Sequence, residues 1–402
     1  MRHVYLYVHD LRSSGVVRNA IDFARRLAQD HPTTLVTGYG EGFFADQAAR
    51  GPFGLQVLAP KEGRLGRAAA ALRLRAWLSG QPAGALMSVG NMGHWTPFLA
   101  CQGLGHIARI YCISNEVARD DGLKSRMRLA WMKLLTLDAA RIVVVGRALR
   151  RLPLFADAIA SGLAAELPNG VDNAQAATLA QAPAPHPWLD EDTPVVVGIG
   201  RLRPQKNFDL LIEAVGRARA SRRLRLAIIG GGAAGEQARL AGLARDAGLG
   251  DDFLLAGETG NVFAWLKRAA VFALPSRWET SSLALLEALA AGTPVVASRL
   301  AGDAAQVLDE GRYGLLFDGH DPDALAKALL AQAVAPVRPG DRALAYDLSL
   351  TNEAYARLVA EVLAAGRARR QGAPRLSRAL ELDPIILKHI RSWRGSWRTR
   401  RG

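Results

Sequence analysis

Cysteines, aromatic residues and long apolar runs are all scarce in this chain of 402 residues. Its two cysteines, Cys101 and Cys112, exclude a disulfide framework and a zinc site built from cysteines, and they favour a reducing compartment. No window holds 18 uninterrupted apolar residues, which predicts that no helix spans a membrane. His9 and Asp10 interrupt the first apolar run too early for a secretory signal peptide. We therefore expect a cytoplasmic protein.

Apolar residues are abundant: they make up 50% of the chain, while only 6% of it is aromatic, as is typical of helix-rich α/β proteins. A chain of this length exceeds the usual limit of a single hydrophobic core, so two domains are expected. The positive charge is uneven. Residues 367–402 hold eleven basic and two acidic residues, and so account for +9 of the net +14 and leave +5 for the rest. This segment is predicted to be a basic tail.

Strand-like apolar runs alternate with helical stretches along the chain, which is the pattern of parallel sheets covered by helices on both faces. One series occupies residues 1–172 and a second occupies 194–346, with a proline-rich linker at 173–193. Residues 347–366 are predicted to form a closing helix. The predicted fold is α/β, with two tandem Rossmann-like, doubly wound domains facing a cleft at the carboxyl ends of their strands.

The stretch 272–298 predicts a buried strand, a helix and a second strand. Residues 280–282 carry hydroxyl groups of the kind that cap a helix. Glu279 lies on the loop before this helix, and Glu287 lies a little over one turn inside it. Free N–H groups at a helix start favour an anion, and carboxylates suit sugar hydroxyls. The stretch is either a site for an anionic, polyhydroxylated ligand or a buried βαβ unit with two incidental glutamates.

A second candidate site follows the predicted strand at 194–200. Arg201 and Lys206 lie on the loop after that strand, where two cations could clamp a diphosphate. The alternative is a solvated basic loop. Together with Glu279 and Glu287, these cations describe a nucleotide-sugar site better than a nicotinamide site.

Residues 230–235 satisfy the pattern G-x-G-x-x-G between a predicted strand and a predicted helix, and Glu258 follows at the spacing of a dinucleotide-binding acid. A nicotinamide-dependent oxidoreductase therefore remains an alternative. The competing interpretation is that the glycines only let the turn approach a nucleotide or pack tightly. The position of the motif, in the second βα unit of its domain, counts against a dehydrogenase because such domains carry the motif in their first unit.

Several of these motifs stand in an order that points to one family. The pieces are Pro168-Asn169-Gly170-Val171-Asp172, Gly200-Arg201-Leu202, Gln205-Lys206-Asn207, Ile229-Gly230-Gly231-Gly232, Leu255-Ala256-Gly257, Ser276-Arg277-Trp278-Glu279 and residues 286–297. As a set they resemble the GT-B-fold retaining glycosyltransferases of family 4, the glycosyl transferases group 1, which use nucleotide-activated sugars. The resemblance covers most of residues 168–330, and the N-terminal half resembles the family only loosely.

The resemblance implies a role for each matching position. Arg201 and Lys206 would hold the diphosphate and stabilise the leaving nucleoside diphosphate, and Glu279 would hold the donor sugar. The remaining implied donor contacts are Gly15 at the phosphate, Gly230 near the nucleotide, Thr259 at the base, Glu287 at the ribose hydroxyls, and the backbone amides of Thr280, Ser281, Ser282 and Leu283 at the sugar. The implied donor is a UDP- or GDP-linked sugar, and no cofactor is implied.

The chain departs from the family pattern at three positions. Ser14 replaces a glycine on the first loop, and Thr280 replaces the glycine after the first acid, which predicts a less permissive backbone there. Asn115 is the nearest equivalent of a histidine that members often carry. Asparagine hydrogen-bonds a sugar hydroxyl but relays no proton. His94 and His106 are the alternative candidates on the acceptor side.

Metal binding has little support in the sequence. The pattern D-x-D occurs at Asp190/Asp192 in the linker and at Asp321/Asp323, where it is typical of a helix cap. Neither pair follows a core strand, as a sugar-diphosphate metal site requires. We expect a metal-independent enzyme.

Two basic segments suggest an anionic partner. The tail interleaves Trp393 and Trp397 with arginines, and residues 126–135 mix cations with large apolar side chains. Such segments suit an anionic membrane, and nucleic acid gives the same signal of composition. The alternatives are a disordered tail without a partner and, for 126–135, a buried face with a solvated basic rim. We favour a membrane surface bound through the tail, and we expect no nucleic-acid partner.

These observations predict a retaining glycosyltransferase, peripheral on the cytoplasmic membrane face. It would transfer a sugar from a nucleotide diphosphate to a saccharide or lipid-linked acceptor in cell-surface polysaccharide or lipopolysaccharide assembly. Two alternatives stay open: an NAD-dependent oxidoreductase using residues 230–235, and a noncatalytic binder of nucleotide sugars or anionic lipids.

Overall fold

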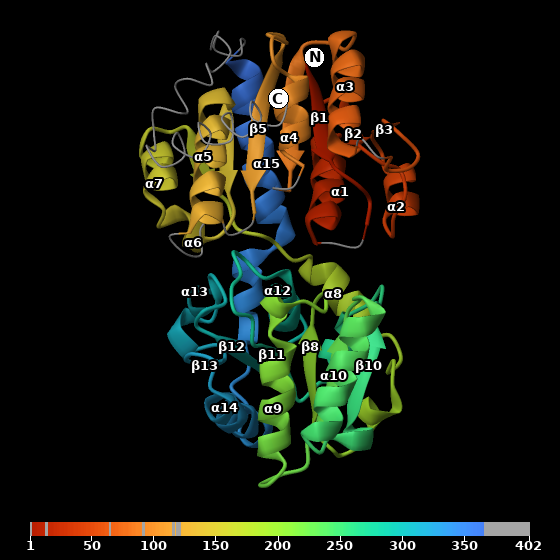
Figure 1. Ribbon diagram of the computed structural model, residues 1–402, viewed down its shortest axis with the longest axis vertical. Coiled ribbons are helices and arrows are strands. Elements are labelled where there is room, and N and C mark those ends of the chain that lie inside the picture. The colour runs from red at the N-terminus through yellow and green to blue at the C-terminus, as the bar shows by residue number, and fades with distance from the viewer. Residues whose placement is uncertain are drawn as a thin grey trace, which may run out of the picture. The chain divides into compact units, whose positions relative to one another are not determined.

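The computed structural model describes residues 2–12, 15–63, 66–90, 93–114, 117 and 122–365 (Figure 1). The predictions for Ser14, Asn115 and the basic tail lie outside these residues. The chain divides into two compact units. Of the described residues, the first unit contains those within 1–145, 149–167 and 352–365, and the second contains those within 146–148 and 168–351.

The first unit is built on a parallel sheet whose described strands lie in the order β3-β2-β1-β4-β5-β6-β7. The strands are β1 (His3–Val8), β2 (Thr33–Thr37), β3 (Gly54–Val57), β4 (Gly84–Val89), β5 (Ile107–Ile113), β6 (Arg141–Val144) and β7 (Ala164–Glu166). Strand side chains alternate between the two faces. On β1, Leu6 therefore contributes to one core and Tyr7 to the core on the opposite face.

Helices cover both faces of this sheet (Figure 1). One face packs against α1 (Gly15–Leu27) and α15 (Leu348–Ala364). The other packs against α3 (Gly66–Ser79), α4 (Trp95–Ala100), α5 (Leu123–Asp138), α6 (Arg147–Arg150) and α7 (Pro153–Ala160). The short helix α2 (Ala45–Ala49) precedes β3. The first unit is thus a three-layer α/β/α sandwich, as buried parallel strands require.

The second unit repeats this architecture with the described strands in the order β10-β9-β8-β11-β12-β13, all parallel. They are β8 (Val195–Ile199), β9 (Arg225–Ile229), β10 (Phe253–Gly257), β11 (Val271–Leu274), β12 (Val295–Ser298) and β13 (Leu315–Phe317). One face packs against α9 (Phe208–Ala218), α10 (Ala234–Asp246) and α14 (Pro322–Val334). The other packs against α8 (Asn173–Leu179), α11 (Phe263–Leu266), α12 (Leu283–Ala290) and α13 (Ala304–Val307).

The linker expected at residues 173–193 is instead part of the second unit. It contains α8, whose N-terminus is capped by Asp172 accepting a hydrogen bond from the Gln175 amide, and a short 3-10 turn at Pro187–Asp190. Leu189 is buried in the core of that unit, and the Arg225 guanidinium lies 5.1 Å from the Trp188 ring centroid. Pro187 starts this turn, because a proline in the first helical turn costs no hydrogen bond.

The closing helix expected at 347–366 is observed as α15, and from Asn352 onward it belongs to the first unit. Tyr355 and Val359 are buried in the core formed with α1. Within the described part of the chain, no helix is long and apolar enough to cross a membrane.

Candidate functional site

Two loops of the second unit follow adjacent strands and carry the main candidates. β8 ends at Ile199, before Arg201 and Lys206, and β11 ends at Leu274, before Glu279. These strands pair with each other, and the order of strands reverses between them. Open parallel sheets bind ligands beyond the carboxyl ends of their strands at such a reversal. The two predicted motifs therefore lie together at the position where this architecture forms a site.

Lys206 and Glu279 are in direct contact. The Lys206 Nζ lies 2.6 Å from Glu279 Oε1, and Ser276 Oγ donates to the same oxygen at 2.9 Å. Their side chains remain 18% and 10% exposed, so both are accessible to a ligand from solvent. Gly200 makes room for the lysine, since a Cβ there would lie 2.6 Å from Lys206 Cε. Lys206 and Glu279, which the sequence predicted from two separate motifs, thus form one ion pair, which we call the paired centre.

Asn207 and Gln205 link the two loops, and the sequence interpretation assigned neither a role. Asn207 Nδ2 donates to the Pro275 carbonyl at 3.2 Å, and the Arg277 Nε donates to Asn207 Oδ1 at 3.0 Å. Gln205 accepts a hydrogen bond from the Arg277 amide at 2.9 Å and donates to the Trp278 carbonyl at 3.1 Å. These bonds hold the lysine loop at a defined distance from the glutamate loop.

The backbone of Asn207 is left-handed, with φ 55° and ψ 39°. Asparagine tolerates this region better than most residues. That preference is the only local signal that could have identified Asn207, because its hydrogen bonds join positions about 70 residues apart in sequence.

Arg201 supplies a second cation at the same strand end. Its side chain forms no ion pair with any described residue, and it lies within electrostatic range of Glu279. Partial burial and the neighbouring Arg203 lower the pKa of its guanidinium, while Glu279 acts in the opposite direction. An arginine starts from so high a pKa that it keeps its charge. An unpaired guanidinium beside the Lys206–Glu279 pair is suited to an anion with several oxygens.

The N-terminus of α12 follows directly on the loop that carries Glu279. Ser282 is its N-cap residue and is 4% exposed, yet its Oγ has no hydrogen-bond partner among the described residues. The expected side-chain cap is therefore missing, and the free helix N–H groups and this hydroxyl stay available. Asn169 Nδ2 donates to the Ser281 carbonyl at 3.0 Å, which fixes the chain as it enters the helix. A helix start of this kind attracts anions.

Thr280 is buried, and it is not among the residues with positive φ. The backbone at this position therefore does not need glycine, and the restriction predicted for Thr280 causes no strain here. Leu283 is the first residue of α12, and Leu283 and Ser281 are both half-buried. Glu287 lies in the second turn and is only 5% exposed. A ligand can approach Glu287 only along its small exposed edge.

The glycine turn after β9 is filled by protein. A Cβ on Gly230 would lie 2.0 Å from the Gly200 carbonyl oxygen, and a Cβ on Gly231 would lie 2.6 Å from Glu258 Oε1. A Cβ on Gly232 would lie 2.5 Å from Leu202 Cβ. The glycines thus permit close packing against the loop that carries Arg201, which agrees with the packing interpretation of the motif.

The remaining candidates lie elsewhere. Gly15 is the first residue of α1 in the first unit. Thr259 follows β10 in the second unit, and its Oγ1 accepts a hydrogen bond from the Asn261 amide at 3.2 Å. His106 contacts the Leu78 carbonyl at 3.2 Å, where it closes a loop.

His94 is not an acceptor-side residue, contrary to the sequence prediction. It is completely buried, with Nδ1 2.7 Å from Ser88 Oγ and its ring against Tyr111. Burial lowers its pKa to about 3, so the imidazole is neutral at physiological pH. A core histidine without solvent access does not contact a sugar acceptor.

Among the described residues, no cluster of three or more His, Cys, Asp or Glu side chains could hold a metal ion. Metal independence stays a prediction. The predicted cap at Asp321 is confirmed, because its side chain accepts a hydrogen bond from the Asp323 amide at 2.9 Å.

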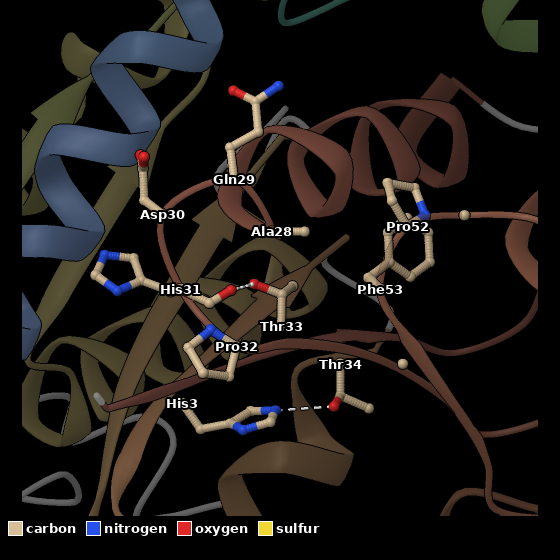
Figure 2. Close-up of a pocket in the computed structure, with 12 residues that line it drawn as sticks. His3, Ala28, Gln29, Asp30, His31, Pro32, Thr33, Thr34, Pro52 and Phe53 are labelled. Carbon is tan, nitrogen blue, oxygen red and sulfur yellow. Dashed lines mark hydrogen bonds between the residues drawn. The ribbon is translucent and has the colours of Figure 1, made fainter.

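A hollow in the first unit is unrelated to these candidates (Figure 2). It is lined by residues at the amino ends of β1, β2 and β3, among them His3, Thr33 and Gly54. The His3 Nε2 lies 2.8 Å from Thr34 Oγ1. Ligands of such sheets bind at the opposite, carboxyl edge. We therefore assign no functional role to this hollow.

Comparisons with solved structures identify the class of fold. The chain superimposes on HepE of Anabaena in complex with UDP with a TM-score of 0.73, covering 90% of this chain and 100% of that one at 18% identity. Sucrose-phosphate synthase of Thermosynechococcus elongatus gives 0.74, covering 91% and 100% at 18% identity. These similarities and the two Rossmann-like sheets confirm the predicted α/β class and show a GT-B fold.

Comparison of sequences finds relatives of the second unit. Residues 193–333 match the family model described as glycosyl transferases group 1. D-inositol 3-phosphate glycosyltransferase 2 of Catenulispora acidiphila is 36% identical over 163 residues, which is 38% of each chain. A D-inositol 3-phosphate glycosyltransferase of Stackebrandtia nassauensis is 40% identical over 151 residues, 35% of this chain and 34% of that one. Residues 193–333 are thus similar to the glycosyl transferases group 1 family, and the match is confined to this part of the chain.

The matched segment spans little more than a third of these curated relatives. It contains β8 to β13 and every candidate residue from Arg201 to Glu287. The sequence similarity is thus concentrated in the unit that carries the paired centre.

Proposed function

We propose that the protein is a retaining glycosyltransferase that binds a nucleotide-diphosphate sugar in its second unit. The observation that carries the proposal is the Lys206–Glu279 contact of 2.6 Å beside the unpaired Arg201, at the reversal between β8 and β11. Two cations and a helix N-terminus suit a diphosphate, and a carboxylate within reach suits sugar hydroxyls. The similarity to HepE, solved with UDP and with UDP-glucose, agrees with a donor of this class.

In this proposal the donor's diphosphate meets Arg201, Lys206 and the N-terminus of α12. Cleavage of the sugar–phosphate bond leaves additional negative charge on the departing nucleoside diphosphate. Cations that are already in position stabilise this charge as it develops, without reorganisation of solvent. Asn207 contributes by holding the Lys206 loop against the loop of Glu279.

Glu279 then acts as a hydroxyl anchor rather than as a general acid or base. It already accepts hydrogen bonds from Ser276 and from Lys206, so its carboxylate is held in one orientation. An acceptor hydroxyl that attacks on the face of the leaving phosphate, and gives its proton to that phosphate, retains the anomeric configuration. Measurement of the product's anomeric configuration by NMR tests this step, and an inverted linkage would contradict it.

The acceptor in this proposal is a saccharide or a lipid-linked saccharide, in cell-surface polysaccharide or lipopolysaccharide assembly. The basic tail motivates membrane association, because it holds +9 of the net charge. Removal of residues 367–402 is expected to weaken binding to anionic vesicles, since each basic residue near such a surface contributes about 1 kcal/mol. Unchanged binding would contradict the role of the tail.

The nicotinamide alternative is less favoured, because its glycine turn is occupied by Glu258 and Leu202. A thermal-shift panel distinguishes the two functions. We expect UDP or GDP and their sugars to stabilise the protein by about 2.7 kcal/mol at about a hundredfold excess over Kd. Lys206→Ala should abolish this shift, while Lys327→Ala on α14 serves as the control. Stabilisation by NAD but not by UDP or GDP would refute the proposal.

A further inference from the structure

A surface of the first unit exposes large apolar side chains. On α4, Trp95 is 43% exposed and Leu99 is 47% exposed. On α5, Leu123 is 40% exposed and Met127 is 57% exposed. The interpretation of residues 126–135 as a buried face holds for Met132 and Leu135 but not for Met127. Clustered apolar side chains on a surface mark a site of interaction, whereas single ones need no explanation.

An aromatic stack joins the two helices into one surface. The rings of Trp95 on α4 and Trp131 on α5 lie 3.7 Å apart and are tilted by only 8°. The buried Phe98 supports the stack edge-on, at 5.0 Å from Trp131. On α5, Leu123 and Met127 precede Trp131 at intervals of four residues and so share its face. We call Trp95, Leu99, Leu123, Met127 and Trp131 the aromatic patch.

Among the described residues of α4 and α5, the exposed charges beside the aromatic patch are of one sign. Lys124 and Arg128 are exposed, and Lys133 is half-buried. None of the three forms an ion pair within the described part of the chain. α4 has no charged residue. The acid of α5, Asp138, is buried, and Arg109 and Tyr111 bond its oxygens. Within α4 and α5, the described residues thus combine exposed apolar groups with the cations Lys124, Arg128 and Lys133, which no acid of these two helices neutralises.

This combination fits the interface of an anionic lipid bilayer. Tryptophan prefers the depth of the lipid headgroups, leucine and methionine enter the acyl region, and lysine and arginine contact anionic headgroups. A nucleic acid would bind the cations but would leave Leu99 and Met127 without a partner. A symmetric dimer through this surface would bring like charges together, which disfavours association.

We propose that the aromatic patch and its basic residues dock the protein on an anionic bilayer. The inference rests on the membrane association that forms part of the proposed function, and it names the surface. It does not depend on the donor site, because α4 and α5 belong to the first unit, and it uses no residue of the tail.

The test measures co-sedimentation of the full-length protein with phosphatidylcholine vesicles, with and without phosphatidylglycerol, at about 0.1 M salt, where the Debye length is about 10 Å. Met127→Glu places a carboxylate in the patch and should lower the partition coefficient at least tenfold. Arg128→Gln should lower it about fivefold, which corresponds to about 1 kcal/mol for one cation at an anionic surface. Both side chains are exposed, so the variants should fold.

Two controls match these changes. Leu344→Glu alters a residue of the second unit that is 57% exposed, the same as Met127. Arg73→Gln removes an exposed cation of α3. Both should bind vesicles like the wild type. The inference is overturned if Met127→Glu binds no worse than Leu344→Glu, or if phosphatidylglycerol makes no difference. It is also overturned if Met127→Glu converts a dimer to a monomer in lipid-free sedimentation with vesicle binding unchanged.

Donor binding provides an independent readout. UDP or GDP should shift the melting temperature of Met127→Glu as it shifts that of the wild type. A wild type that binds vesicles through this surface but no nucleotide would refute the proposed donor site alone. A wild type that binds nucleotide but not vesicles would refute the docking surface alone.

Discussion

The ion pair between Lys206 and Glu279 predicts opposite effects on two ligands of the same site. In the ligand-free protein the Glu279 carboxylate partly neutralises the cation that the diphosphate requires. Glu279→Gln removes this negative charge but keeps the size of the side chain and an oxygen that can accept from Ser276. We therefore expect the variant to bind a free nucleoside diphosphate more tightly, and to transfer sugar more slowly.

The magnitude follows from the geometry. A phosphate oxygen at about 2.8 Å from the lysine nitrogen lies on the order of 5.5 Å from the carboxylate when the ammonium lies between them. At an effective dielectric constant of about 40, the repulsion that is removed is roughly 1.5 kcal/mol, or about tenfold in Kd. The lost hydrogen bond from a sugar hydroxyl to a charged acceptor costs about 1.5–3 kcal/mol, which is roughly 10- to 150-fold in kcat/KM.

Isothermal titration with UDP and GDP measures the first effect, and the rate of sugar transfer measures the second. Glu213→Gln on α9 is the control, because it makes the same change of charge in an exposed ion pair with Arg217. If Glu279→Gln weakens the binding of the free diphosphate as much as that of the sugar nucleotide, then Glu279 only holds Lys206 in place. Unchanged transfer by the variant would refute its contact with the donor sugar.

Three further predictions concern single residues. Asn207→Gly keeps the left-handed backbone and removes the side-chain bonds to Pro275 and Arg277, so it should raise the Kd for the diphosphate severalfold. Asn207→Ala should in addition lower the free energy of unfolding by about 1–2 kcal/mol relative to Asn207→Gly, because alanine is strained in the left-handed region; equal unfolding curves of the two variants would contradict this strain. Thr280→Gly should leave nucleotide binding unchanged and cost roughly 0.5–1 kcal/mol of stability, because the backbone there needs no glycine; tighter binding by titration would contradict this. His94 has a folded pKa of about 3 against an unfolded value of 6.5, so the unfolded state takes up its proton first and stability falls as pH drops from 6.5 towards 3. At about pH 5 the loss of stability is roughly 2 kcal/mol. Denaturant unfolding at about pH 7 and pH 5 should show that His94→Gln lacks this loss; a variant whose stability falls as much as that of the wild type would contradict the prediction.

Central strands were predictable because they are buried on both faces and therefore read as continuous apolar runs. The two strands predicted within 272–298 are observed as β11 and β12, and the one predicted at 194–200 is observed as β8. The edge strands β3 and β7 were missed. Most of their residues are half-buried or exposed, so they carry no continuous apolar signal.

The sequence predicted which charged residues form the candidate site, but it did not predict the hydrogen bonds that hold the two loops of the site together. Arg201, Lys206 and Glu279 follow strands whose order in the sheet brings their ends together. The bonds of Asn207 depend on a left-handed backbone and on a partner loop far along the sequence. His94 was misassigned because sequence spacing does not distinguish a loop histidine from one that the core encloses.

The path of α15 has a consequence for the order in which the molecule is made. The first sheet is complete in sequence by β7, yet one of its faces needs the helix that ends at Ala364. Tyr355 stacks on Phe23 at 4.1 Å, across more than 300 residues of chain. During synthesis on the ribosome, the first unit therefore emerges with an apolar face uncovered and must wait for nearly the whole chain. The first unit should therefore stop binding chaperones when α15 has emerged from the ribosome, and not already when β7 has been made.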